Sequence, residues 1–143
     1  MTDVAEMLAQ LPLDLDGDPH GVGFTTGLGL TLLEVGPTKA LARAHAGPQH
    51  HQEAGIVHGG WHASIVETVG SIAAYIKAAE HGQSVVGVSN YTEFFRPHVE
   101  GPVDVEALPV HQGRTQQVWE VRIARPDGKL VARGQLHLQH VDR

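Results

Sequence analysis

One long helical pattern constrains this chain more than any other feature. It begins at about Gly59 and ends near Gly82, spanning about 59–81, and segments with strand character lie on both sides of it. Apolar residues recur three or four positions apart within it, at Trp61, Ile65, Val69, Ile72 and Ile76. Such a stripe can pack on a sheet. We therefore expect strands from both sides of the helix to form a sheet that covers it.

In the strand segments, apolar residues alternate with polar ones or are enriched, and Gly, Pro and Asp separate the segments. They are residues 22–35 and 39–46 before the helix, and 84–95, 102–112, 115–125 and 129–140 after it. The first two predict a hairpin, and the last four predict an antiparallel meander, with a tight turn at Asp127-Gly128. The expected fold class is α+β, with a curved antiparallel sheet of five to six strands wrapped around one central helix.

At 143 residues the chain fits a single domain, 1–143. Residues 1–20 predict a short amphipathic docking helix and a loop, since apolar residues at helical spacing precede Pro12. Residues 21–143 form the expected core.

Composition removes several function classes. The chain has ten basic and sixteen acidic residues, which argues against nucleic-acid binding. No apolar run is long enough to cross a membrane, so a cytoplasmic protein is expected. With no cysteine, chemistry is left to carboxylates, hydroxyls and imidazoles. The eleven histidines are scattered without a ligand motif, which favours no metal site and no cofactor, although histidine-rich metal binding stays an alternative.

Glu67 lies in the middle of the long helix, where an unpaired carboxylate is costly unless it is solvated or used. We expect it on a stripe of small residues with Ala63, Gly70, Ser71 and Ala74, opposite the apolar stripe. That stripe lacks the Lys and Arg of a solvent-facing surface. A functional Glu67 and a solvated Glu67 both remain open from this pattern.

The segment from Gln52 to Gly60 leads into the helix. The first turn leaves backbone N–H groups without partners and adds partial positive charge, and glycines at 59 and 60 let a substrate carbonyl approach them. The alternative is that the glycines only permit a tight turn. Gly59 and Glu67 are separated by roughly 12 Å of helix rise. One carbonyl can therefore reach both only if two copies of the helix lie side by side, in a dimer with a shared site.

At these residues the chain resembles the hotdog-fold thioesterases, within them the phenylacetate-degradation-type branch that includes the Arthrobacter-type 4-hydroxybenzoyl-CoA thioesterases. The similarity runs from about residue 20 to the C-terminus. The motifs that carry it are Gln52, the 55–60 segment Gly-Ile-Val-His-Gly-Gly, Glu67, Ser71, the 89–97 segment Ser-Asn-Tyr-Thr-Glu-Phe-Phe-Arg-Pro, the 110–115 segment Val-His-Gln-Gly-Arg-Thr and the 119–121 segment Trp-Glu-Val.

The resemblance implies that the Gly59 N–H polarises a thioester carbonyl and that Glu67 is nucleophile or general base. Gln52 and His58 would shape the site, and Ser71 would hold the carboxylate or the hydrolytic water. The implied partners are an acyl-CoA substrate and further copies of the chain, as a dimer and then a tetramer.

The turn with Arg114 and Thr115 would lie near the nucleotide and phosphates of CoA, unless Arg114 is only a solvated turn residue. Phe94 and Phe95 replace histidines of some relatives, which favours an apolar or aromatic acyl group. The implied function is hydrolysis of an aryl- or arylacetyl-CoA. The alternatives are a non-catalytic acyl-CoA sensor and a hydratase or dehydratase of the same fold.

Overall fold

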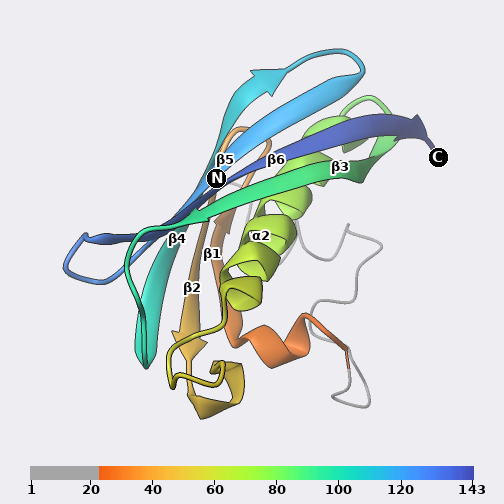
Figure 1. Cartoon of the computed structure of the whole chain (residues 1–143). Helices are drawn as coiled ribbons and strands as arrows, with labels where there is room; N and C mark the ends of the chain where they lie inside the picture. The colour runs from red at the N-terminus through yellow and green to blue at the C-terminus, as the bar shows by residue number, and fades with distance from the viewer. Residues whose placement is uncertain (1–22) are drawn as a thin grey trace.

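The computed structural model describes residues 23–143, so the predicted N-terminal helix within residues 1–20 lies outside the described residues. The described part consists of one helix and six strands, with two short 3-10 turns before the helix (Figure 1). The elements are the 3-10 turn Thr26–Leu28, β1 Leu30–Val35, β2 Ala40–Ala46, the 3-10 turn Pro48–His50, α2 Gly59–Ala79, β3 Gln83–Phe94, β4 Gly101–Gln112, β5 Gln116–Ala124 and β6 Leu130–Asp142. This confirms the α+β class and the curved sheet around a central helix.

The six strands form one antiparallel sheet in the order β1-β2-β4-β5-β6-β3. Only β4, β5 and β6 are a meander, so the prediction of a four-stranded meander was wrong for β3. That strand pairs with β6, while β4 pairs with β2. The three-stranded meander has two open edges, and the early hairpin fills one while β3 fills the other, which leaves fewer backbone groups unpaired.

The first strand is shorter than predicted, because β1 begins only at Leu30. A 3-10 turn precedes it and ends at Gly29, whose φ of 67° is in the left-handed region. A side chain there would also collide with β2, since a Cβ on Gly29 would lie 2.8 Å from the His45 carbonyl oxygen. Glycine therefore ends the turn and lets the chain enter the sheet.

Small residues let α2 lie close to the sheet. Four alanines of β2, at positions 40, 42, 44 and 46, are buried against the core. Gly70 faces Leu136, whose Cδ2 would lie 2.8 Å from a Cβ at that position, and Ala74 is also buried. The predicted small stripe is therefore wrong in part: Gly70 and Ala74 pack on the sheet, because the sheet curves far enough to cover this side of the helix. Ala63, Glu67 and Ser71 keep some exposure.

The strand β3 packs against the helix α2 and forms an edge of the sheet (Figure 1). Several large apolar side chains on and just after it are exposed, and these are Val86, Val88, Tyr91, Phe94 and Phe95. No helix within residues 23–143 is long and apolar enough to cross a membrane.

Candidate active site

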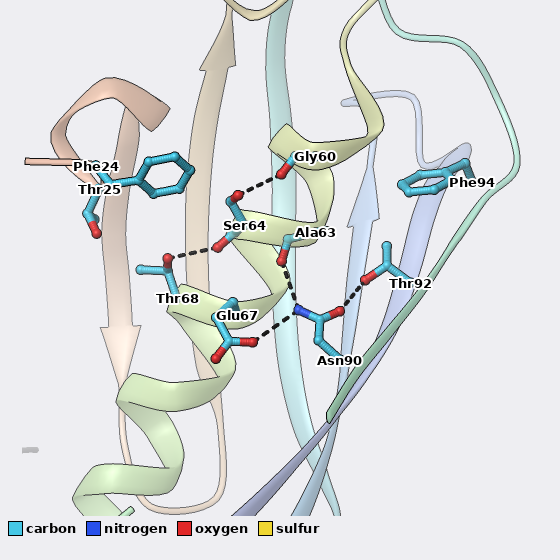
Figure 2. Close-up of a pocket in the computed structure, with 10 residues that line it drawn as sticks. All are labelled: Phe24, Thr25, Gly60, Ala63, Ser64, Glu67, Thr68, Asn90, Thr92 and Phe94. Carbon is cyan, nitrogen blue, oxygen red and sulfur yellow. Dashed lines mark hydrogen bonds between the residues drawn. The ribbon is translucent and has the colours of Figure 1, made fainter. Parts of the chain in front are cut away.

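Glu67 is held by a side chain from the neighbouring strand. The amide Nδ2 of Asn90, on β3, donates to Glu67 Oε2 at 3.1 Å and to the Ala63 carbonyl oxygen at 3.0 Å (Figure 2). The Thr92 hydroxyl donates to Asn90 Oδ1 at 2.7 Å, which fixes the orientation of the amide. A Cβ at Gly87 would lie 3.0 Å from Glu67 Oε1, so glycine there leaves room for the carboxylate. Glu67 is therefore partly exposed, and Asn90 holds its carboxylate in a fixed position.

Asn90 and Thr92 were not predicted as site residues. Both lie in the 89–97 segment that carries the family resemblance, so this motif is the sequence feature that could have pointed to them. Their side chains share one face of β3 because they are two residues apart. Nothing in the sequence alone shows that this face meets Glu67, since that depends on how β3 lies against α2.

A cavity of about 700 Å³ opens beside the Glu67 carboxylate. Figure 2 shows the residues that line it, which are Phe24, Thr25, Gly60, Ala63, Ser64, Glu67, Thr68, Asn90, Thr92 and Phe94. Ser71 is not among them, and its hydroxyl makes no hydrogen bond to Glu67 in the chain described. Ser64 and Thr68 donate to helix carbonyl oxygens, of Gly60 at 2.6 Å and of Ser64 at 2.8 Å.

His58 caps the N-terminus of α2. Its Nδ1 accepts a hydrogen bond from the Gly60 N–H at 2.7 Å, so one of the free donors of the first turn is already used. The Gly59 N–H donates to no residue in the range 23–143. Of these two neighbouring amides, the one at Gly59 is therefore left for a ligand, at the positive end of the helix dipole.

A second cavity of about 610 Å³ lies at this end of the helix. Its lining is formed by Gln52, Ile56, Val57, Gly59, His62, Phe94, Phe95, Arg96, Pro97 and His98. The Gln52 side-chain oxygen accepts a hydrogen bond from the Ala54 N–H, which leaves the Gln52 Nε2 group to donate. The structure thus brings Gln52 and Gly59 together.

The two cavities have Phe94 in common, but Gly59 lines only one of them and Glu67 only the other. A Cβ on Gly59 would lie 2.9 Å from the Phe94 ring, so the ring lies directly over this glycine. One copy of the chain therefore does not gather Gly59 and Glu67 around a single ligand atom. This agrees with the separation expected from the helix rise.

Comparison with known proteins identifies the family of the chain. Residues 54–132, more than half of the chain, match the Thioesterase superfamily. The chain belongs to the thioesterase superfamily. Rv1847 of Mycobacterium tuberculosis, a proposed esterase, is 42% identical over 123 residues, which are 85% of this chain and 88% of Rv1847. Its solved structure has a TM-score of 0.82 and covers 84% of this chain and 97% of its own.

Two further similar proteins support the family assignment. The proofreading thioesterase EntH of Klebsiella pneumoniae is 37% identical over 103 residues, 72% of this chain and 73% of EntH. The Escherichia coli PaaI structure, at 20% identity and a TM-score of 0.74, covers 88% of this chain and 86% of its own and shows the shared fold. The predicted hotdog thioesterase is confirmed, and the protein is a thioester hydrolase.

The turn that carries Arg114 and Thr115 connects β4 to β5 in this thioesterase, and both residues are exposed. It is tied to β6 through its backbone, since the carbonyl oxygens of Arg114 and Thr115 both bond to His140. Neither residue lines either cavity. Within one copy of the chain, the turn is therefore not brought together with Glu67 or Gly59.

The histidines have separate local roles in the structure. His50 Nε2 pairs with the Gly27 carbonyl oxygen, His51 Nε2 with that of Val99, and His98 Nε2 with that of Gly101. Among residues 23–143, no three potential ligand side chains gather as they would around a metal ion.

Asn90 gives the first test of this site. Asn90→Ala should lower kcat for thioester hydrolysis about tenfold and change KM less than kcat, because its main effect is to free the Glu67 carboxylate from a fixed position, although it also removes the partner of the Thr92 hydroxyl. Steady-state kinetics of the variant would measure this. Ser89→Ala, on the exposed neighbouring position, is the matched control. An unchanged kcat in Asn90→Ala would show that Glu67 does not depend on this hydrogen bond.

The pKa of His62 is lower than that of an exposed histidine. Burial lowers the pKa of His62 from 6.5 to about 4, and the nearby His98 adds to the effect. Between pH 6.5 and about pH 4, His62 therefore binds a proton in the unfolded chain but not in the folded chain. The free energy of unfolding should therefore fall as the pH drops from 6.5 towards 4, by about 2 kcal/mol from this residue between about pH 7 and about pH 4.5.

Urea unfolding of the wild type and of His62→Leu, at both pH values and one protein concentration, would measure this. The variant should lose about 2 kcal/mol less than the wild type on acidification. His81→Leu removes an exposed histidine and should behave as the wild type. Equal acid sensitivity in all three proteins would contradict the prediction.

Proposed function

We propose that this thioesterase hydrolyses an acyl-CoA thioester, with aryl- or arylacetyl-CoA favoured, to a free acid and CoA, without metal or organic cofactor. The observation that carries the proposal is the Glu67 carboxylate, which Asn90 holds at the edge of an open cavity. The free N–H of Gly59, at the start of the same helix, supplies a donor for a developing oxyanion.

In the proposed reaction the Gly59 N–H donates to the thioester carbonyl oxygen as negative charge develops there. As a general base, Glu67 takes a proton from water while the water oxygen bonds to the carbonyl carbon. The carbon–sulfur bond then breaks, and the thiolate of CoA recovers the proton. As a nucleophile, Glu67 instead bonds to the carbonyl carbon, expels the thiolate and forms a mixed anhydride that water opens.

The two routes differ in where the oxygen of water first enters. During a single turnover in water labelled with oxygen-18, a nucleophilic Glu67 can gain label in its own carboxylate when the anhydride opens. A general-base Glu67 gains none. Label found in the Glu67 peptide by mass spectrometry would therefore exclude a pure general-base route.

A shared site in a dimer would bring Gly59 of one subunit to Glu67 of the other. Two features support this arrangement. Gly59 and Glu67 line different cavities of one chain. The edge strand β3 carries exposed apolar side chains beside both cavities, including Tyr91 at 70% and Phe94 at 56% exposure, and such an edge is open to pairing with a second copy. Pairs of these dimers would form the tetramer.

The aromatic preference rests on Phe94 and Phe95. Phe94 lines both cavities, and Phe95 lines the one with Gly59, so a flat apolar acyl group would meet aromatic surfaces there. Arg114 and Thr115 would meet the phosphates and nucleotide of CoA across the dimer, because arginine suits phosphate in charge and geometry.

The direct test is thiol release from a panel of aryl-, arylacetyl- and medium-chain acyl-CoAs, followed with a thiol reagent. The proposal expects turnover that is fastest with aromatic acyl groups. Faster turnover of the aliphatic members would refute the aromatic preference alone. Tight acyl-CoA binding without thiol release would instead support the sensor, and hydration of an enoyl-CoA would support the hydratase.

The shared site predicts complementation between two inactive variants. Gly59→Pro removes the proposed oxyanion donor at the first helical position, where proline is well tolerated, and His58 already has the extended backbone that precedes proline (φ −63°, ψ 136°). Glu67→Gln removes the carboxylate. Mixed and re-associated, the two should recover about one quarter of wild-type activity, since about half of the dimers are mixed and each has one intact site.

Gly59→Ala keeps the N–H and adds the same Cβ, so it shows whether crowding of Phe94 alone inactivates the enzyme. Mixing either variant with itself must recover nothing. If the mixed dimers also recover nothing although exchange of subunits is demonstrated, Gly59 and Glu67 do not act across subunits.

A further inference from the structure

The buried face of β6 ends on a histidine that the proposed mechanism does not use. Leu136 and Leu138 are fully buried on this face, and His140, at the next position on the same face, is 8% exposed. It lines neither the Glu67 cavity nor the Gly59 cavity. A buried imidazole needs hydrogen bonds, whereas an apolar side chain in this place would need none. The partners of His140 therefore indicate what the residue does.

The buried amide of Gln117 determines where the ring of His140 carries its proton. Trp119 Nε1, which can only donate, bonds to Gln117 Oε1 at 2.8 Å. The Gln117 nitrogen therefore lies on the other side of the amide, where it donates to the Ala74 carbonyl oxygen at 2.9 Å and lies 2.9 Å from His140 Nε2. His140 Nε2 is thus an acceptor, which leaves the ring proton on Nδ1.

That proton faces the turn 113–115 between β4 and β5. His140 Nδ1 lies 3.0 Å from the Arg114 carbonyl oxygen and 3.2 Å from Gln83 Oε1, so its N–H donates to acceptors at the end of the sheet. The backbone N–H of His140 donates to the next carbonyl oxygen of the turn, that of Thr115, at 2.9 Å. One buried residue thus holds two consecutive carbonyl groups of the turn, while Arg114 and Thr115 themselves are exposed.

The same contacts connect the turn to α2. Gln117 joins His140 to the carbonyl oxygen of Ala74, which lies on the helix that carries Glu67. The turn is therefore fixed to the interior of the molecule by a chain of buried hydrogen bonds, which are stronger than the same bonds in water.

We propose that His140 is a positioning residue for the CoA part of the substrate. By holding the carbonyl groups of Arg114 and Thr115, it fixes the turn in the place where these two exposed residues meet the phosphates of CoA. The inference rests on the proposed function, which assigns the phosphates and nucleotide to this turn.

The expected effect is on binding and not on the chemical step. A turn that is already ordered loses less conformational freedom when phosphates bind, so its contacts contribute more to affinity. These contacts are the same before and during the reaction, because the phosphates are remote from the thioester carbonyl. Loss of the positioning bond should therefore raise KM and leave kcat unchanged. A substrate without phosphates should not respond.

The test uses two variants that divide the functions of the imidazole. His140→Asn keeps an N–H donor near the position of Nδ1 and loses the contact with Gln117, whereas His140→Gln keeps an acceptor near the position of Nε2 and loses the bond to Arg114. His137→Gln is the matched control, since His137 lies on the same strand and bonds to Gln116 at the surface. Circular dichroism and gel filtration show whether each variant is folded and assembled.

Each protein is assayed with one acyl group on two carriers, phenylacetyl-CoA and phenylacetyl-pantetheine, which lacks the nucleotide and the phosphates. The wild type should have a KM at least about tenfold lower for the CoA thioester. His140→Gln should raise KM for the CoA thioester about tenfold, with its kcat and its KM for the pantetheine thioester within about twofold of the wild type. His140→Asn and His137→Gln should stay within about twofold for both substrates.

Arg114→Ala shows whether His140 acts through the turn. Combined with His140→Gln, it should have a KM for the CoA thioester within about twofold of Arg114→Ala alone, since both changes remove one interaction. A double variant that multiplies the two single losses would overturn the assignment. The same holds for a wild type with equal KM for both thioesters, for an equal rise of both KM values in His140→Gln, and for His140→Asn that behaves as His140→Gln.

Failure of the proposed function is read separately. If the wild type hydrolyses neither thioester, binding of CoA itself to the wild type, His140→Gln and His140→Asn is measured by calorimetry. Weaker binding in His140→Gln alone would keep the role of His140. The absence of CoA binding, or equal affinity in all three proteins, would refute it.

Discussion

Glu67→Gln should lower kcat for thioester hydrolysis about a thousandfold, the size typical of a removed general base or nucleophile. Glutamine has nearly the same volume, and its side-chain oxygen can still accept from Asn90 Nδ2, so the fold and the cavity are retained. What is lost is the negative charge that takes a proton or attacks the carbonyl. Release of CoA thiol, measured in single-turnover and steady-state assays, gives the rate.

Glu93→Gln is the matched control, because Glu93 lies on β3 and pairs with Arg133 at 3.1 Å at the surface, outside both cavities. Its kcat should stay within about twofold of the wild type, since exposed ion pairs contribute little. Gel filtration and circular dichroism confirm that both variants are folded and assembled. Turnover by Glu67→Gln at the wild-type rate would remove Glu67 from the mechanism.

Gln117→Leu should lower the free energy of unfolding by about 3 kcal/mol, because it removes the centre of a buried polar network. The Gln117 side chain is fully buried between the sheet and α2. It donates to the Ala74 carbonyl oxygen at 2.9 Å, and its own oxygen accepts from Trp119 Nε1 at 2.8 Å. It also meets His140 Nε2 at 2.9 Å. Leucine fills similar space but leaves the Trp119 N–H and the His140 ring without this partner.

Urea or guanidinium unfolding at one protein concentration would measure the loss. Gln116→Leu is the control on the same strand, since Gln116 is exposed and its side chain bonds to His137 at the surface. It should cost less than about 0.5 kcal/mol. If Gln117→Leu unfolds at the wild-type denaturant concentration, the buried network contributes no net stability.

The candidate site divides into residues that local sequence reveals and residues that only packing reveals. Glu67 could be found because a carboxylate in mid-helix is conspicuous, and Gly59 because glycine at a helix start exposes backbone N–H groups. Asn90 could not be assigned, since its partner is 23 positions away in the sequence and on another element. His140 looked like one of eleven scattered histidines until its burial and its contact with the Arg114 carbonyl oxygen were known.

The same division holds for the fold. The sequence by itself determined the central helix, a sheet of five to six strands and most of the strand bounds, because periodicity and turn residues act over a few neighbouring positions. Only the tertiary structure decided that β3 pairs with β6, that Gly70 and Ala74 face the sheet, and that Glu67 and Gly59 open into different cavities. Strand order and sheet curvature arise from contacts between distant segments, and these contacts leave no periodic signal in the chain.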